Sequence, residues 1–108
     1  MELSSTFLLE YIRMASSKDY LLYVLDFLRD VPNVSYKKMM GEYILYKDEV
    51  IFGGIYDNRF LVKKTPSSDA YHFKEVIPYP TSKGFYLVDI EDSNEIRELV
   101  LKIYNDLR

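Results

Sequence analysis

Short apolar runs separated by short polar breaks fill residues 35–64, and this stretch predicts the centre of the fold. Three of the runs are rich in the aromatic and β-branched residues that favour strands: Tyr43–Lys47, Val50–Tyr56 and Arg59–Lys63. Polar breaks as short as these favour antiparallel hairpins between neighbouring strands. The sequence therefore predicts a three-stranded antiparallel meander.

Two polar pairs separate the predicted strands. Asp57 and Asn58 both tolerate a positive φ, so this pair favours a two-residue turn. Asp48 and Glu49 form a weaker turn pair, which leaves a longer loop open between the first two strands.

Two-residue turns would divide the side chains of the meander between two faces. The predicted core face consists of Ile44, Tyr46, Ile51, Gly53, Ile55, Phe60 and Val62. The opposite face would carry Tyr43, Leu45, Lys47, Val50, Phe52, Gly54, Tyr56, Arg59, Leu61 and Lys63, a set too apolar to be simply solvated and too charged to be fully buried. Adjacent glycines in the middle of a strand indicate a bulge or a close helix approach more often than a ligand site.

Helices are predicted on both sides of the meander. A hydroxyl cap at Ser16 or Ser17 precedes an apolar stripe that begins at Leu21 and ends before Pro32. The final helix begins at the Asp92-Ser93 cap, and its apolar residues repeat with helical spacing: Ile96, Leu99, Val100, Ile103 and Leu107.

Shorter elements complete the predicted order. Ser35 caps a short helical turn over Tyr36–Met40, a short helix lies around Asp69–Glu75, and Phe85–Ile90 forms another strand. The predicted fold is a two-layer α+β domain in which helices pack on one face of an antiparallel sheet. Its order is one helix, the three-stranded meander, a second helix, one or two further strands, and a final helix.

Residues 1–14 are predicted to be an N-terminal extension of a single domain over residues 15–108. Leu3, Phe7 and Tyr11 have helical spacing, but an isolated helix of this length is marginal in water. A docked helix and a mobile tail both remain open for this segment.

The composition of the chain limits the classes of function that the protein can have. A chain of 108 residues that is 48% hydrophobic and 29% charged is long enough for one core and too apolar for disorder. Its net charge of -3 argues against direct binding of nucleic acid, except by a local basic patch. The chain contains no cysteine, and no apolar run is long enough for a membrane span, so we expect a cytoplasmic protein.

No constellation of catalytic residues is visible. His72 is the one histidine of the chain, and a transition-metal site ordinarily needs more than one nitrogen or sulfur ligand. The acidic pairs at Asp48-Glu49 and Glu91-Asp92 are explained by a turn and a helix start. We therefore expect no catalytic residue, no metal site and no cofactor, and a protein that is not an enzyme.

The same central stretch contains a pattern of basic, aromatic and turn residues: Lys37, Lys38, Met39, Gly41, Tyr43, Tyr46, Asp48, Phe52, Leu61 and Lys63. This pattern resembles the N-terminal domain of the TfoX/Sxy competence regulators. The chain departs from the family pattern at Met40, Glu42, Glu49 and Val62, and the resemblance covers about residues 17–107. It implies a stand-alone version of that domain, without the C-terminal domain of full-length members. Such a domain would be non-catalytic and would regulate transcription or competence through protein contacts.

The predicted contact surface for a partner protein, such as a transcription regulator, consists of Lys37, Lys38, Met39, Gly41, Tyr43, Phe52, Tyr56, Arg59 and Lys63. The aromatic and basic members of this set also suit the stacking of single-stranded bases, so a nucleic-acid-binding protein is one alternative. A small-ligand sensor is another alternative. We also expect weak homodimer formation, because the second sheet face would leave apolar residues exposed in a monomer.

Overall fold

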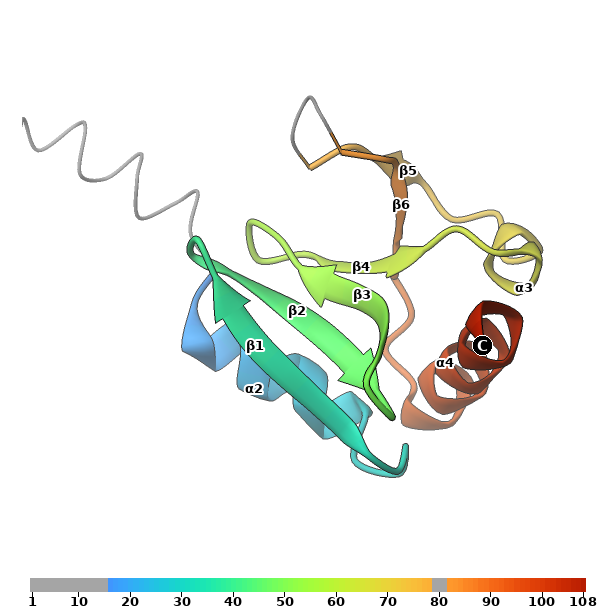
Figure 1. Cartoon of the computed structure of the whole chain (residues 1–108), viewed down its shortest axis with the longest axis horizontal. Helices are drawn as coiled ribbons and strands as arrows, with labels where there is room; N and C mark the ends of the chain where they lie inside the picture. The colour runs from blue at the N-terminus through green and yellow to red at the C-terminus, as the bar shows by residue number, and fades with distance from the viewer. Residues whose placement is uncertain (1–15, 79–81) are drawn as a thin grey trace, which may run out of the picture.

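A single antiparallel sheet of six strands organises the computed structural model, which describes residues 16–78 and 82–108. The elements are α2 (Lys18–Phe27), β1 (Val34–Met39), β2 (Glu42–Lys47), β3 (Val50–Ile55), β4 (Phe60–Lys63), α3 (Pro66–Asp69), β5 (Glu75–Val76), β6 (Phe85–Leu87) and α4 (Ser93–Leu107). The strand order is β1-β2-β3-β4-β6-β5 (Figure 1). The α+β class and the packing of helices against an antiparallel sheet confirm the predicted architecture.

Three successive two-residue turns join the first four strands. Both central residues of the β2–β3 turn, Asp48 and Glu49, have positive φ, and so do Asp57 and Asn58 between β3 and β4. This backbone geometry matches the right-handed twist of the strands that the turns connect. The tight turn at residues 57–58 is confirmed, and the turn at residues 48–49 is equally short.

Strand β1 corrects the prediction of a helical turn over Tyr36–Met40. Residues 34–39 pair with β2 along their whole length, and Met40 and Gly41 form a third two-residue turn. The prediction was wrong because β1 lies at the edge of the sheet and five of its six residues are exposed. Such a strand has no apolar alternation that could distinguish it from a surface turn.

A bulge in β3 corrects the predicted core face. Leu45 pairs with Gly53 and Tyr46 pairs with Ile51, so Phe52 is an extra residue opposite β2. The extra residue reverses the alternation of side chains within β3. As a result, the side chains of β2 that face the core are Tyr43, Leu45 and Lys47. Four residues of β3 and β4 were correctly predicted on the core face: Gly53, Ile55, Phe60 and Val62. The predicted core residues Ile44, Tyr46 and Ile51 lie on the other face.

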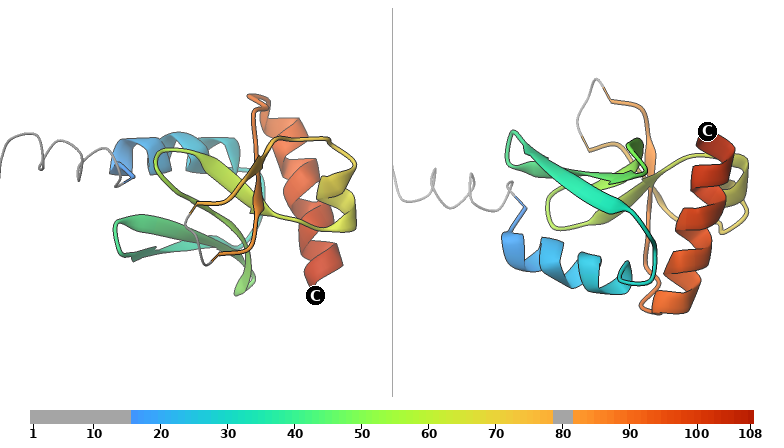
Figure 2. Two further views of the ribbon diagram at one scale, coloured as in Figure 1. Left: turned by 90° about the horizontal axis from the view of Figure 1, so that it is seen from above. Right: turned by 60° about the horizontal axis from the view of Figure 1, so that its bottom comes forward.

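Helices α2 and α4 cover the core face. Figure 1 shows α2 behind the sheet, and Figure 2 shows α4 crossing one end of the molecule at a steep angle to α2. The helices contribute Leu21 and Val24 from α2, and Ile96, Leu99, Val100 and Ile103 from α4, to one buried cluster with the strands. The predicted stripe of α4 is thus confirmed, and so is its Asp92 cap, which accepts a hydrogen bond from the Glu95 N–H at 3.0 Å.

The shorter elements differ in their bounds from the predictions. Helix α3 begins at Pro66 instead of near Asp69, because the Thr65 side chain accepts a hydrogen bond from the Ser68 N–H and starts the helix earlier. Strand β6 ends at Leu87, and β5 is the second further strand that the prediction left open, although two residues carry no periodic pattern that could have located it. Residues 1–14, predicted as an extension, lie outside the described residues.

Gly53 permits the close approach of β3 and β4 beside the bulge. A Cβ atom at this position would lie 2.2 Å from the Leu61 carbonyl oxygen, which is a backbone atom that cannot turn aside. We therefore expect Gly53→Ala to lower the free energy of unfolding by about 2 kcal/mol or more, measured by urea denaturation.

Gly84→Ala is the matched control for this prediction. The nearest atom to a Cβ at Gly84 is Lys64 Nζ at 2.8 Å, the end of a flexible side chain. This variant should lose less than about 1 kcal/mol. Equal losses in the two variants would show that the β3–β4 approach does not constrain the fold.

Candidate functional site

One face of the sheet has no described helix over it, and we call it the open face. It carries the apolar side chains that alternate with the core residues: Ile44, Tyr46, Ile51, Leu61, Phe85 and Leu87. Figure 1 looks onto this side, with α2 behind the sheet. Leu61, near its centre, is fully buried yet does not belong to the cluster between the sheet and the helices. The other five side chains are half-buried, so solvent reaches part of this face, and an accessible apolar sheet surface is typical of an interaction site.

Aromatic rings and lysines surround the apolar centre of the open face. The Tyr56 ring lies against Gly54, where a Cβ atom would come within 2.7 Å of it, and packs on Phe85 with ring centroids 5.6 Å apart. Lys37 Nζ lies 5.6 Å from the centroid of the Tyr46 ring, a cation–π geometry. The face therefore offers flat aromatic surfaces next to positive charge.

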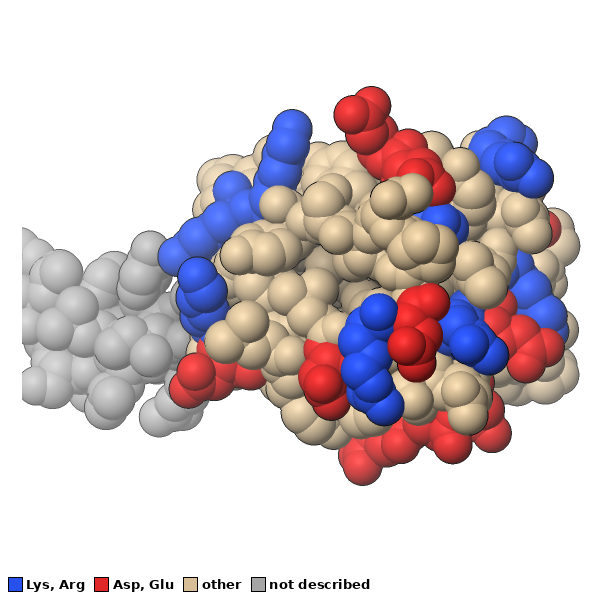
Figure 3. All heavy atoms as spheres, turned by 90° about the horizontal axis from the view of Figure 1, so that it is seen from below, with Lys and Arg blue, Asp and Glu red and all other residues tan. Residues whose placement is uncertain are grey.

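The outer edge of β1 borders the open face. No described strand pairs with this edge, so the backbone groups of β1 that point away from β2 are available to another chain. Lys37, Lys38 and Met39 are exposed along it. In Figure 3, basic side chains gather at the end of the molecule that carries the β1–β2 turn.

The structure divides the predicted partner-contact residues into two groups. Lys37, Lys38, Met39, Gly41, Tyr56, Arg59 and Lys63 are exposed or half-buried along β1, at the turns and at the end of β4. Tyr43 and Phe52 are 4% and 0% exposed and belong to the core, so their placement on a contact surface was wrong. The bulge at Phe52 is the physical reason, because it exchanges the two faces of β2.

The same bulge explains why sequence reasoning missed Ile44 and Tyr46 as residues of the open face, whereas Phe85 was missed because its strand had not been paired with β4. The adjacent glycines at positions 53 and 54 were a signal of irregular pairing, but they did not reveal which residue of the strand is inserted.

Lys47 forms the most buried charged group among the described residues. It is 5% exposed, and its Nζ donates hydrogen bonds to the Pro32 carbonyl oxygen at 3.1 Å and to Asp48 Oδ2 at 2.9 Å. The ammonium group also lies 4.8 Å from the centroid of the Tyr104 ring on α4. These contacts satisfy the lysine and tie the β2–β3 turn to two neighbouring elements, so the cluster stabilises the fold and leaves no unpaired group for catalysis.

The described residues show no other constellation for chemistry. Within the two described ranges, no group of three or more histidine, cysteine or acidic side chains is arranged to hold a metal ion. His72 is exposed and has a positive φ of 59° after the short helix α3. No helix in the described ranges is both long and apolar enough to cross a membrane.

Removing the Lys47 side chain tests its structural role. We expect Lys47→Ala to lower the free energy of unfolding by about 1–3 kcal/mol, because the Pro32 carbonyl oxygen loses its donor and the packing against Tyr104 is lost. Lys38→Ala, at an exposed position of β1, should change stability by less than about 0.5 kcal/mol. Urea denaturation of both variants measures the difference. If Lys47→Ala lowers the free energy of unfolding no more than Lys38→Ala does, the contacts of Lys47 do not stabilise the fold.

The pH dependence of stability tests the same cluster. The hydrogen bond from Lys47 lowers the pKa of the Asp48 carboxyl group, and contacts with the Asn33 and Tyr104 side chains act in the same direction. A lowered pKa in the folded state stabilises the fold above the unfolded pKa, and this contribution is lost as the pH falls through the folded pKa. The stability difference between the parent protein and Lys47→Ala should therefore shrink on acidification, and a difference that grows toward low pH would contradict the assignment.

Comparison with known proteins places the chain beside a protein of similar length. No protein-family model matches the chain. A protein of Spirochaeta aurantia, described as an uncharacterized 12.7 kDa protein in the trpE 5′ region, is 32% identical over 91 residues. The match covers 81% of this chain and 79% of the Spirochaeta protein. The chain therefore belongs to the same family as this Spirochaeta aurantia protein.

Proposed function

We propose that the chain is a non-catalytic adaptor or regulatory domain that binds another protein through the open face and the outer edge of β1. One observation carries the proposal: an apolar sheet face without a described helix over it lies beside an unpaired strand edge. Apolar faces that solvent can partly reach and free strand edges are aggregation hazards, so natural proteins keep them mainly where a partner covers them.

The chemistry of β1 indicates the kind of partner. An extended segment of another protein can add to a free sheet edge, because backbone hydrogen bonds give affinity and alternate side chains give specificity. Lys37 and Lys38 point to opposite faces of the edge, and no described acidic side chain forms an ion pair with either of them. An acidic extended segment would place negative charge next to both lysines.

A second copy of this chain fits the edge less well than an acidic partner. Pairing of two β1 strands would bring the lysines of both copies onto one short ladder, where like charges repel. A weak homodimer stays a prediction, and any such contact would have to avoid this edge.

The resemblance to the TfoX/Sxy regulators supports a regulatory class for the adaptor. The matching lysines, Lys37 and Lys38, lie on the proposed contact edge. The resemblance implies regulation of transcription or competence through protein contacts. We propose a cytoplasmic location, because the lack of cysteine agrees with a reducing compartment.

A second candidate function is the binding of single-stranded nucleic acid. The observation that favours it is the aromatic and basic character of the open face, where Tyr46, Tyr56 and Phe85 lie near Lys37 and Lys63. Sheets that bind single strands use such rings to stack bases and lysines to contact phosphates. The acidic net charge of -3 lowers the long-range attraction that such binding needs.

Charge reversal on β1 tests the adaptor proposal. The full chain, a Lys37→Glu/Lys38→Glu variant and an Arg97→Glu/Lys102→Glu control are each used as bait, and retained proteins are quantified by mass spectrometry. The control makes the same change in charge on exposed residues of α4. A protein retained by the parent and the control but lost from the β1 variant is then purified, and its affinity should fall by about tenfold or more in the β1 variant, with a larger difference at low salt.

Three results would contradict the proposal. The first is a set of retained proteins that does not change in the β1 variant. The second is equal loss of binding in the α4 control, which would indicate a general charge effect. The third is tight binding of a fluorescent dT20 oligonucleotide that falls steeply with salt and disappears in the β1 variant, which would favour the nucleic-acid function.

A further inference from the structure

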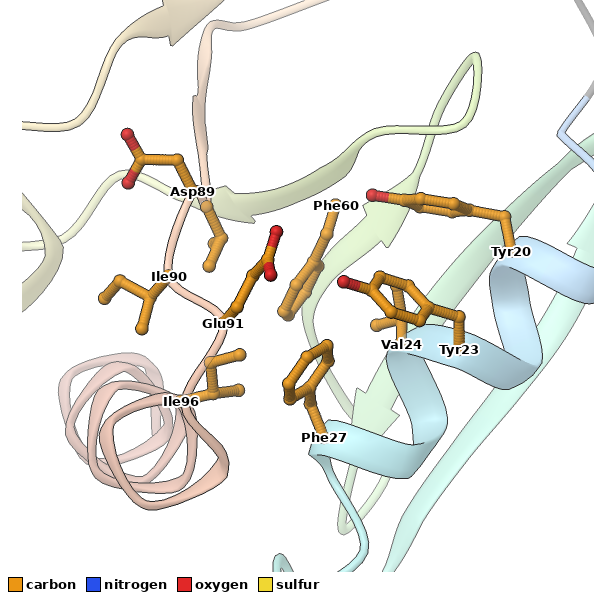
Figure 4. Close-up of a pocket in the computed structure, with 10 residues that line it drawn as sticks. Tyr20, Tyr23, Val24, Phe27, Phe60, Asp89, Ile90, Glu91 and Ile96 are labelled. Carbon is orange, nitrogen blue, oxygen red and sulfur yellow. The ribbon is translucent and has the colours of Figure 1, made fainter.

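A hollow lies on the helix side of the sheet, between α2 and the link from β6 to α4, and thus away from the open face. It has a volume of about 150 Å³. Cavities of about this volume hold a molecule the size of benzene, with six non-hydrogen atoms. Figure 4 shows the residues that line it. Its chemistry differs from that of the open face, so the inference below does not depend on the proposed function.

Three aromatic rings from α2 form one wall of the hollow. Tyr20, Tyr23 and Phe27 follow one another along the helix face, with ring centroids 5.7 Å apart for the first pair and 5.1 Å apart for the second. The rings of Tyr23 and Phe27 are nearly perpendicular, at 86°. Val24, Phe60 and Ile96 provide a buried apolar floor. Tyr23 is 47% exposed, so the wall can be reached from solvent.

The opposite wall is acidic. Asp89 and Glu91 line the hollow, and none of its lining residues is a lysine, an arginine or a histidine. In Figure 4 the Glu91 carboxylate is turned toward the tyrosine hydroxyl groups, whereas the Asp89 carboxylate points away from the rings. No described basic side chain forms an ion pair with Glu91. Burial raises the pKa of the Tyr20 hydroxyl, and the nearby charges of Tyr23 and Glu91 raise it further.

We infer that this hollow is a binding site for an alkylammonium group, with Glu91 as the counter-ion and the rings of Tyr20, Tyr23 and Phe27 as the surface that the cation contacts. The faces of aromatic rings carry negative electrostatic potential, and tyrosine and phenylalanine attract cations within about 6 Å of the ring centre. A carboxylate at the edge of such a wall attracts the same charge. An anion would meet the Glu91 carboxylate without any basic group in the lining of the hollow, and a purely apolar ligand would make no use of that charge.

The volume limits the size of the group. A butylammonium or tetramethylammonium ion has five non-hydrogen atoms and so fits a space that suits a benzene-sized molecule. Such a group has two natural sources, a free small amine and the end of a lysine side chain on another protein. Both present the same chemistry to the hollow, and they differ in whether a peptide backbone accompanies the amine.

Titrations of the full-length ¹⁵N-labelled chain test the inference by NMR. The probes are n-butylammonium chloride and tetramethylammonium chloride, with n-butanol as the neutral control and sodium chloride at matched ionic strength. We expect saturable shifts in the amide signals of α2 and of residues 89–91 with the ammonium ions only. Glu91→Gln should weaken binding by about fivefold or more, as expected for the loss of a close charge contact.

Asp89→Asn is the matched control. It removes the same charge as Glu91→Gln, two residues earlier in the chain, but the Asp89 carboxylate points away from the rings. It should change the affinity by less than about twofold, because a carboxylate that points away from the rings makes no close contact with a cation held against them. Tyr23→Leu keeps an apolar side chain on the exposed side of α2 but removes one ring, so it should weaken binding of tetramethylammonium in a protein that still folds.

Nα-acetyl-lysine N-methylamide, which has a peptide-like backbone and keeps its ε-ammonium group, distinguishes the two sources. Binding at least as tight as that of butylammonium indicates a lysine side chain of a partner protein, and much weaker binding indicates a free amine; either result supports an alkylammonium site. Equal shifts with n-butanol, shifts that do not saturate or that lie elsewhere in the chain, or the same loss of affinity in Glu91→Gln and Asp89→Asn would each overturn it.

Discussion

One inserted residue in β3 determines which side of the sheet is buried. Phe52 has no partner in β2, and its side chain is fully buried in the core. The insertion reverses the alternation of side chains along β3, so that Leu45 and Tyr43 of β2 face the helices and Ile44 and Tyr46 face away from them. Gly53 next to the bulge lets β3 approach β4 more closely than any residue with a Cβ atom could. The core under α2 and α4 and the open face on the other side both follow from this local geometry.

Much of the fold could be predicted from the sequence, because its strongest signals are local. The apolar stripe of α4, the cap at Asp92, and the turn at Asp57-Asn58 depend on residues within a few positions of one another. The position of the bulge could not be predicted, because it depends on how two strands pair. The edge strand β1 was missed for a related reason, since its exposed residues carry no pattern that burial would impose.

The candidate site was only partly predictable for the same physical reason. Lys37 and Lys38 are exposed in almost any arrangement of this stretch, and the structure places them along the free edge of β1. Tyr43 and Phe52 have the composition of interface residues but belong to the core. The hollow beside Glu91 could not be predicted at all, because α2 and the link before α4 lie about 65 residues apart in the chain and meet only in the folded protein.

The two surfaces lie on opposite sides of one strand. In β4, Phe60 points to the helix side and lines the hollow, whereas its neighbour Leu61 lies on the open face. The surfaces also differ in charge, because lysines surround the open face and carboxylates border the hollow. A single small domain thus presents two chemically distinct contact sites while keeping one core between its sheet and helices.

The buried side of β2 is tested most directly by the reactivity of single cysteines introduced into the folded protein, since the natural sequence contains none. Ile44→Cys and Leu45→Cys place a thiol at adjacent positions of β2, one on the open face and one in the core. We predict that Ile44→Cys reacts readily with a thiol reagent under native conditions and that Leu45→Cys reacts only when the protein unfolds. The reverse order of reactivity would contradict the bulge and, with it, the assignment of the open face.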